Sequence, residues 1–184
     1  MEMNFCRRCG KELIRQTANG HHFKCENDHD IFNNPAPTSG VFFVEADNRH
    51  ALLSVRGIEP SKGMLDAFGG FVENSEGLEE ALEREMREEL GLGPEHYERP
   101  RYLVSAPSTY PYGGDTYTLV TTLFWSRLNE GAQPKAQDDV AAIRRIDIHD
   151  ETVLDEAHGD DIRQGILALR RLFPVKLDTR KEDR

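Results

Sequence analysis

Two glutamates lie on the face of a predicted helix where apolar residues are expected. Between positions 78 and 90, apolar residues recur at helical spacing, and Glu85 and Glu89 point into the same stripe. The apolar members of this stripe are Leu78, Ala81, Leu82, Met86 and Leu90. Burying an ionised carboxylate costs several kcal/mol unless a positive group compensates it, and two adjacent carboxylates also repel each other. A divalent cation would compensate both charges, so this face is a candidate metal site.

Neighbouring charges on the same helix extend the acidic cluster. Glu88 lies one turn from Glu85, and Arg84 can reach Glu88 at the four-residue spacing that pairs side chains on a helix. The glutamates that point away from the stripe are typical of a solvated face: Glu79, Glu80 and Glu83.

Carboxylates around a hard cation suit the hydrolysis of a diphosphate. The negative oxygens of a diphosphate repel nucleophiles, so a catalyst must neutralise them, orient a water molecule and help to remove its proton. Mg²⁺ prefers oxygen ligands and usually keeps several waters, so a few carboxylates and a substrate phosphate suit it. Glu85 and Glu89 are both candidates for the base that accepts the proton.

The segment from Gly70 to Leu92 resembles the Nudix box, G-x5-E-x7-R-E-U-x-E-E-x-G-U, in which U is an apolar residue. All nine specified positions match within 23 residues, so a chance match is very unlikely. The matching residues are Gly70, Glu76, Arg84, Glu85, Met86, Glu88, Glu89, Gly91 and Leu92.

This resemblance implies a Nudix hydrolase, an enzyme that cleaves the diphosphate linkage of a nucleoside diphosphate joined to another group. It implies an α/β fold, an α/β/α sandwich with a mixed β-sheet, in which Glu76 and Arg84 brace the loop and helix of the box. The implied ligands of Mg²⁺ or Mn²⁺ are the carbonyl of Gly70 and the carboxylates of Glu85, Glu88 and Glu89. In some members of this family the base is an acid from a later loop, and the candidates here are Glu130, Asp138 and Asp139.

A second set of possible metal ligands lies near the amino end. Two residues separate Cys6 from Cys9, and three separate Cys25 from His29. This spacing is typical of two zinc knuckles, because thiolate and imidazole favour tetrahedral Zn²⁺. The alternative, a disulfide with a spare thiol, suits an oxidising compartment, but the cysteine number is odd and no signal peptide is visible.

His29 is the predicted fourth zinc ligand, because histidine is a far better zinc ligand than aspartate in such sites, and alternatives stay open. His29 adjoins Asp28, the position at which a ribbon with two CxxC knuckles would carry its last cysteine, and His21 and His22 are further candidates. We expect a structural role, because four protein ligands leave no position for water and about 35 residues rarely fold alone. A four-ligand ribbon before a Nudix domain is similar to the layout of the NADH pyrophosphatase branch.

Composition narrows the classes of function. The 184 residues carry a formal net charge of -10, which disfavours a general surface for nucleic acid or anionic membrane. No apolar run approaches the roughly 20 residues that span a bilayer. We expect a cytoplasmic protein, with a homodimer as one option because many Nudix relatives are dimeric. Its expected parts are a zinc ribbon (1–35), a Nudix domain (36–175) and a charged tail (176–184).

Turn residues and periodicity predict the order of elements. Residues 33–39 (NNPAPTS) are expected to form a linker. Strands are predicted at 40–46, 51–56, 101–105, 116–128 and 143–148, the first two joined by a hairpin turn. One helix is predicted from near Leu78 to Gly91 with Ser75 as its cap, and another from Asp160 or Asp161 to Phe173.

A proline-rich segment beyond the box bears on the substrate. The segment SAPSTYPYGG, residues 105–114, is partly similar to the S-Q-P-W-P-F-P-x-S array of NADH pyrophosphatases. The positions in register are Ser105, Pro107, Tyr110 and Pro111, whereas Ser108, Thr109 and Gly113 depart from the array. Tyr110 and Tyr112, on a loop stiffened by proline, are candidates to stack a base of the substrate.

Three functions from different classes stay open. The favoured one is hydrolysis of NADH, ADP-ribose or a similar nucleoside diphosphate derivative. The second is decapping of an NAD-capped RNA, with basic residues of the ribbon contacting the RNA: Arg7, Arg8, Lys11, Arg15 and Lys24. The third is a non-catalytic Nudix ligand sensor, which the intact set of carboxylates disfavours.

Overall fold

The main body of the protein is a mixed β-sheet between two helices. The computed structural model describes residues 3–175, so the predicted tail at 176–184 lies outside the described residues. The strands run in the order β10-β5-β4-β9-β8, with β6 paired to β5 and β7 paired to β4. Their bounds are β4 (Ala36–Val44), β5 (His50–Arg56), β6 (Leu65–Asp66), β7 (Phe68–Phe71), β8 (Arg101–Tyr112), β9 (Asp115–Ser126) and β10 (Val140–Asp147). Only β4 and β9 pair in parallel among these, which makes the sheet mixed.

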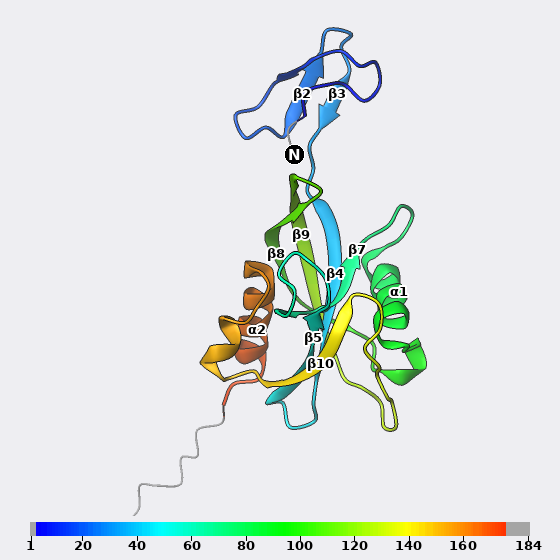
Figure 1. Ribbon diagram of the computed structural model, residues 1–184, viewed down its shortest axis with the longest axis vertical. Helices are drawn as coiled ribbons and strands as arrows, with labels where there is room; N and C mark the ends of the chain where they lie inside the picture. Colours follow the sequence, from blue (N-terminus) through cyan, green and yellow to red (C-terminus); the bar gives the residue numbers. More distant parts are fainter. Residues whose placement is uncertain (1–2, 176–184) are drawn as a thin grey trace, which may run out of the picture.

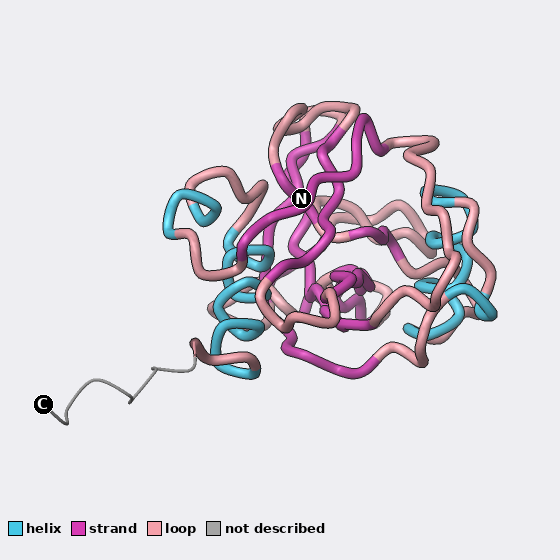
Figure 2. Tube along the Cα trace, turned by 90° about the horizontal axis from the view of Figure 1, so that it is seen from below, coloured by secondary structure: helices cyan, strands magenta, loops and turns pink. Residues whose placement is uncertain are grey.

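Helices α1 (Leu78–Leu90) and α2 (Asp160–Leu172) cover opposite faces of this sheet (Figure 1). Successive side chains of β4 alternate between the two layers, because a strand directs neighbouring residues to opposite faces. Phe42 packs in the core under α2, whereas Val41 and Phe43 pack in the core under α1. Figure 2 shows helical segments on both sides of the strands. The α/β sandwich with a mixed sheet, expected from the sequence, is confirmed.

The ends of α1 have identifiable causes. Gly91 ends the helix in the left-handed conformation, at φ 66°, and its N–H donates to the carbonyl of Arg87, as the sequence predicted. The prediction of Ser75 as the cap is wrong. Gly77 is the N-cap, and its N–H donates to the carboxylate of Glu80 at 2.8 Å.

Two segments that were expected to be irregular are strands. Residues 33–39 do not form a linker throughout, because β4 already begins at Ala36. The segment 105–114 is not a loop either: Ser105 to Tyr112 continue β8 and pair with β9 in a long hairpin. Gly113 and Gly114, both with positive φ, make its tight turn. The prolines are tolerated because β8 is an edge strand of the sheet and needs no second partner.

The amino-terminal residues form a separate three-stranded sheet. It consists of β1 (Leu13–Arg15), β2 (His22–Cys25) and β3 (Asp30–Phe32) in that order. Its core is small and contains Cys6, Phe23, Cys25 and Ile31. In Figure 1 this sheet lies beyond the start of β4, at the end of the molecule toward which the β8–β9 hairpin extends.

The contact between α2 and the sheet predicts a strict size limit at Gly165. A Cβ there would lie 2.5 Å from Phe42 Cε2 and 2.6 Å from Leu123 Cδ1. Gly165→Ala should therefore lower the free energy of unfolding by about 1–3 kcal/mol despite the better helix propensity of alanine. Urea denaturation measures this, with the exposed Gln164→Ala on the same helix as the control. Equal stability of the two variants would contradict the tight contact.

Candidate active site

Glu89 is a buried carboxylate on the packed face of α1. Only 6% of the residue is exposed, and its Oε2 accepts a hydrogen bond from the N–H of Gly69 at 2.8 Å. Burial, together with the negative charge of Glu85, raises the pKa of Glu89 to about 9. The structure thus confirms that Glu89 points into the apolar stripe, and a positive ligand at this place would restore its charged form.

Arg84 connects the other acidic residues of the predicted box. Its Nη1 donates to Glu85 at 2.8 Å and to Glu88 at 3.1 Å, and its Nε donates to Glu76 at 2.8 Å. Its Nη2 also donates to the carbonyl of Phe71 at 2.9 Å, which ties the helix to the end of β7. Burial is the largest influence on Glu85 and raises its pKa although Arg84 opposes this. The guanidinium therefore neutralises part of the acidic cluster and orders the loop before α1.

Two glycines of β7 allow close backbone contacts, Gly70 with α1 and Gly69 with β4. A Cβ on Gly70 would lie 2.5 Å from Glu85 Oε1, so the carboxylate occupies the space that any other residue would fill. Gly69 has a φ of 144°, and a Cβ on it would lie 2.0 Å from the carbonyl oxygen of Ser39. Gly70 is therefore required by the contact with α1, and Gly69 by the contact between β7 and β4. Glu85 lies against the backbone of Gly70 and Glu89 against that of Gly69, but Glu85, Glu88 and Glu89 do not form a compact group of ligand atoms among the described residues.

A cavity extends from this acidic end toward β8 and α2. Gly70 and Glu89 line one part of it, and Tyr110 and His158 line another. Asp139 also lines it, whereas the other proposed loop acids, Glu130 and Asp138, are not among its lining residues; the charge of Asp138 does act on Glu85.

Tyr110 and Tyr112 differ in position although they share a face of β8. Tyr110 lines the cavity, packs edge-on against Phe71 and has the guanidinium of Arg56 5.8 Å from its ring centroid. Tyr112 stacks on Tyr110 at a centroid distance of 6.2 Å, but it is 64% exposed and does not line the cavity. Of the two residues proposed to stack a base, the structure places only Tyr110 in the cavity wall.

Several residues of the cavity were not among the site residues predicted from the sequence. Arg56 donates to Asp66 at 2.6 Å, and burial raises the pKa of that carboxyl even though the guanidinium opposes the shift. On the opposite side, Thr38, Thr121 and Asp161 form a buried chain of hydrogen bonds. The sequence gives a hint for Asp66, which is a charged residue within the apolar run LDAF. A charged residue buried in such a run needs a partner.

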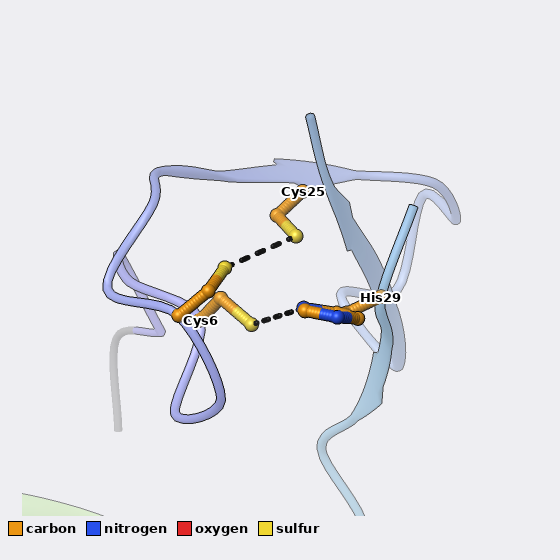
Figure 3. A group of neighbouring side chains, drawn as sticks. Cys6, Cys25 and His29 are labelled. Atoms are coloured by element: carbon orange, nitrogen blue, oxygen red, sulfur yellow. Dashed lines mark hydrogen bonds between the residues drawn. The ribbon is translucent and has the colours of Figure 1, made fainter. Parts of the chain in front are cut away.

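The four predicted zinc ligands converge in the amino-terminal sheet. The Sγ atoms of Cys6, Cys9 and Cys25 and a ring nitrogen of His29 all lie within 4.8 Å of one another. Cys6 Sγ is 3.6 Å from His29 Nδ1, and Cys9 Sγ is 3.7 Å from Cys25 Sγ; both contacts are dashed in Figure 3. All three cysteines are free thiols, so the disulfide alternative does not hold in this structure.

The other candidates for the fourth ligand are engaged elsewhere. His22 contacts Asp30 at 2.7 Å and stacks on Phe32, and the ring of His21 lies 5.5 Å from that of Phe32. Asp28 pairs with Lys24 at 2.7 Å. Of the four candidates, the structure brings His29 to the three thiols.

Comparison with known proteins agrees with this geometry. The family model of the NUDIX domain matches residues 34–167, which is more than half of the chain. This protein belongs to the NUDIX family. The match confirms the enzyme class expected from the box, a Nudix pyrophosphohydrolase. A comparison with curated protein sequences gives no significant match.

Solved structures share the fold at low sequence identity. A NUDIX hydrolase from Nitrosomonas europaea has a TM-score of 0.60 and 23% identity, covering 93% of this chain and 90% of that one. An Ap4A hydrolase from C. elegans has a TM-score of 0.59 and 14% identity, and the match covers 74% of this chain and 96% of that one. The NUDIX domain of Shewanella oneidensis NrtR, complexed with ADP ribose, has a TM-score of 0.57 and 22% identity, covering 77% and 90%.

The Nitrosomonas europaea match includes part of the amino-terminal segment. Residues 34–184 make up only about four-fifths of this chain, so a match over 93% must extend before residue 34. The similarity therefore covers more than the Nudix sheet. Among the described residues, no helix is long and apolar enough to cross a membrane.

The raised pKa of Glu89 predicts how stability changes with pH without added divalent cation. Between the ordinary value of 4.5 and about 9, the folded state keeps a proton that the unfolded state loses, so stability should fall as pH rises. Glu89→Gln removes this titration. The variant should lose less stability than the wild type across this window, as urea denaturation at several pH values measures. Parallel pH profiles for the two proteins would show that burial does not hold the proton on Glu89.

Proposed function

We propose that this Nudix protein is a metal-dependent diphosphohydrolase that cleaves a nucleoside diphosphate derivative such as NADH or ADP-ribose. One observation carries the proposal: a single cavity is lined by Gly70 and by Glu89 of α1 in one part and by the ring of Tyr110 on β8 in another. A diphosphate at the acidic end and a planar ring at Tyr110 would match this distribution of charge and aromatic surface. Two structural neighbours, an Ap4A hydrolase and a domain complexed with ADP ribose, are consistent with a nucleotide-derived substrate.

The box residues would hold the metal ions. The residues proposed as ligands are Gly70, Glu85, Glu88 and Glu89, whose oxygens suit Mg²⁺ or Mn²⁺. When bound, such ions neutralise the diphosphate and lower the pKa of water. Arg84 would keep Glu85 and Glu88 positioned while remaining bonded to Glu76, which is the bracing role that the resemblance implies for this pair.

Hydrolysis then needs a group that takes a proton from water. The water oxygen bonds to one phosphorus, the bridging P–O bond breaks, and the departing phosphate keeps that electron pair. Asp139 is favoured among the loop candidates because it lines the cavity together with Glu89. Its position is held by the backbone, since the N–H of Gly57 donates to its carbonyl at 2.6 Å.

We also propose that Cys6, Cys9, Cys25 and His29 bind structural Zn²⁺. With Zn–S near 2.3 Å and Zn–N near 2.0–2.1 Å, a tetrahedral site needs S···S of about 3.8 Å and S···N of about 3.6 Å. The observed separations of 3.7 Å and 3.6 Å fit these values. A role in RNA binding has less support, because Lys11 and Lys24 of this sheet pair with Glu26 and Asp28.

The zinc proposal predicts one Zn²⁺ per chain by elemental analysis of the purified protein. His29→Asn should lose most of the zinc and unfold the amino-terminal sheet, because a core of this size needs the metal. Asp28→Asn is the matched control: it is adjacent, exposed and outside the thiol cluster, so its zinc content should stay normal. Full zinc content in the His29 variant would contradict the assignment.

The proposed function predicts that, with Mg²⁺ present, the protein hydrolyses at least one compound of a panel. The panel consists of NADH, NAD, ADP-ribose, FAD and dinucleoside polyphosphates. Glu89→Gln should lower turnover by about 100-fold or more, since even outer partners of metal ligands are worth about 10- to 100-fold. Glu83→Gln on the same helix should retain activity, because Glu83 pairs with Arg87 and does not line the cavity. Product analysis by chromatography measures both. No cleavage across the panel, or a fully active Glu89 variant, would overturn the proposal.

A further inference from the structure

A buried carboxylate lies at the part of the cavity that is formed by α2. Asp161 is 6% exposed and lines the cavity in the first turn of that helix. Its Oδ2 accepts from the hydroxyl of Thr121 at 2.6 Å, and its Oδ1 accepts from the N–H of Ile162 at 3.0 Å. Both donors are uncharged. A carboxylate has about four acceptor sites, so these two bonds leave acceptor capacity for a ligand.

The sheet orients the hydroxyl groups of this region toward Asp161. Thr38 and Thr121 are opposite each other in the parallel pairing of β4 and β9. The hydroxyl of Thr38 donates to Thr121 at 2.9 Å, and the hydroxyl of Thr121 donates to Asp161. The hydroxyl protons of Thr38 and Thr121 are both engaged in these two hydrogen bonds. This part of the cavity therefore presents hydrogen-bond acceptors to a ligand.

The neighbouring residues favour a planar ring. Tyr110 and His158 both line the cavity, with their rings nearly perpendicular at a centroid distance of 6.4 Å. The Nδ1 atom of His158 is buried and has no hydrogen-bond partner among the residues that the structure describes. An aromatic wall beside a buried acceptor suits a ring that carries an N–H group on its edge.

We propose that Asp161 selects substrates whose planar ring carries an exocyclic N–H donor, either the amino group of adenine or the carboxamide of nicotinamide. The inference rests on the proposed hydrolase function and names the group that the site recognises. An oxo or carboxylate group in place of the donor would face the buried carboxylate without a hydrogen bond. That arrangement places two hydrogen-bond acceptors against each other in a buried site and is disfavoured.

The test compares each good substrate with analogues that lack one donor. For whichever of NADH, NAD and ADP-ribose is cleaved with Mg²⁺, hypoxanthine replaces adenine; for NAD, nicotinic acid also replaces nicotinamide. We expect kcat/KM to fall about 10- to 100-fold for the analogue that lacks the recognised donor, as for a lost hydrogen bond to a charged group. The analogue that fails identifies adenine or nicotinamide as the recognised ring.

Asp161→Asn distinguishes recognition from a general loss of activity. An asparagine amide can donate to the oxo or acid analogue, so the ratio of kcat/KM between substrate and analogue should fall toward one. Asp160→Asn is the control, because Asp160 lies in the same turn of α2 with its side chain 86% exposed. The control should keep the wild-type ratio.

The possible failures are distinguishable. Equal cleavage of the substrate and its analogues by the wild type would overturn the role of Asp161 and leave the hydrolase function intact. An unchanged ratio in Asp161→Asn would do the same. Absence of cleavage across the whole panel, FAD and dinucleoside polyphosphates included, would instead overturn the hydrolase function, and this inference with it.

Discussion

The packing of α1 against the sheet buries carboxylates, and the surrounding structure compensates for that burial. Glu89 lies on the face of the helix that carries Leu82 and Met86, so the contact that stabilises the core also removes the carboxylate from water. Burial raises the pKa of Glu89, and the N–H of Gly69 donates a hydrogen bond to its carboxylate. Arg84 compensates the neighbouring acids. Gly70 of β7 follows from the same constraint, since a Cβ there would lie 2.5 Å from the carboxylate of Glu85.

The amino-terminal sheet differs from the main sheet in having very little apolar core. Its apolar core is too small to stabilise a fold by burial, and two of the four residues in that core are cysteines. A tetrahedral ion would cross-link the knuckle at Cys6 with the turn that precedes β3, where His29 lies. The two proposed metal sites therefore differ in chemistry: soft thiolates in a closed cluster on the small sheet, and hard oxygens beside an open cavity on the main sheet.

The cavity combines elements that are distant in the chain. The parallel pairing of β4 with β9 joins Thr38 to Thr121, and α2 then adds Asp161 to the same chain of hydrogen bonds. On the other side, the long β8–β9 hairpin carries Tyr110 to Arg56 and Phe71. The acidic end of the cavity comes from the Nudix box, whereas these walls come mostly from segments outside it. The distribution of polar groups in the walls therefore bears on which nucleotide is bound.

Local sequence alone determined the helix of the box, its end at Gly91, the inward direction of Glu85 and Glu89, and the set of three thiols. These features depend on helical periodicity, on the conformational freedom of glycine and on short spacings, which act within a few residues. Tertiary structure alone decided that 105–112 is an edge strand, that His29 joins the thiols, and that Asp139 and Asp161 line one cavity. Those outcomes depend on partners far away in the chain, such as Thr121 and Asp161, which are 40 positions apart. No local pattern encodes such a contact, because it forms only when the sheet and both helices pack together.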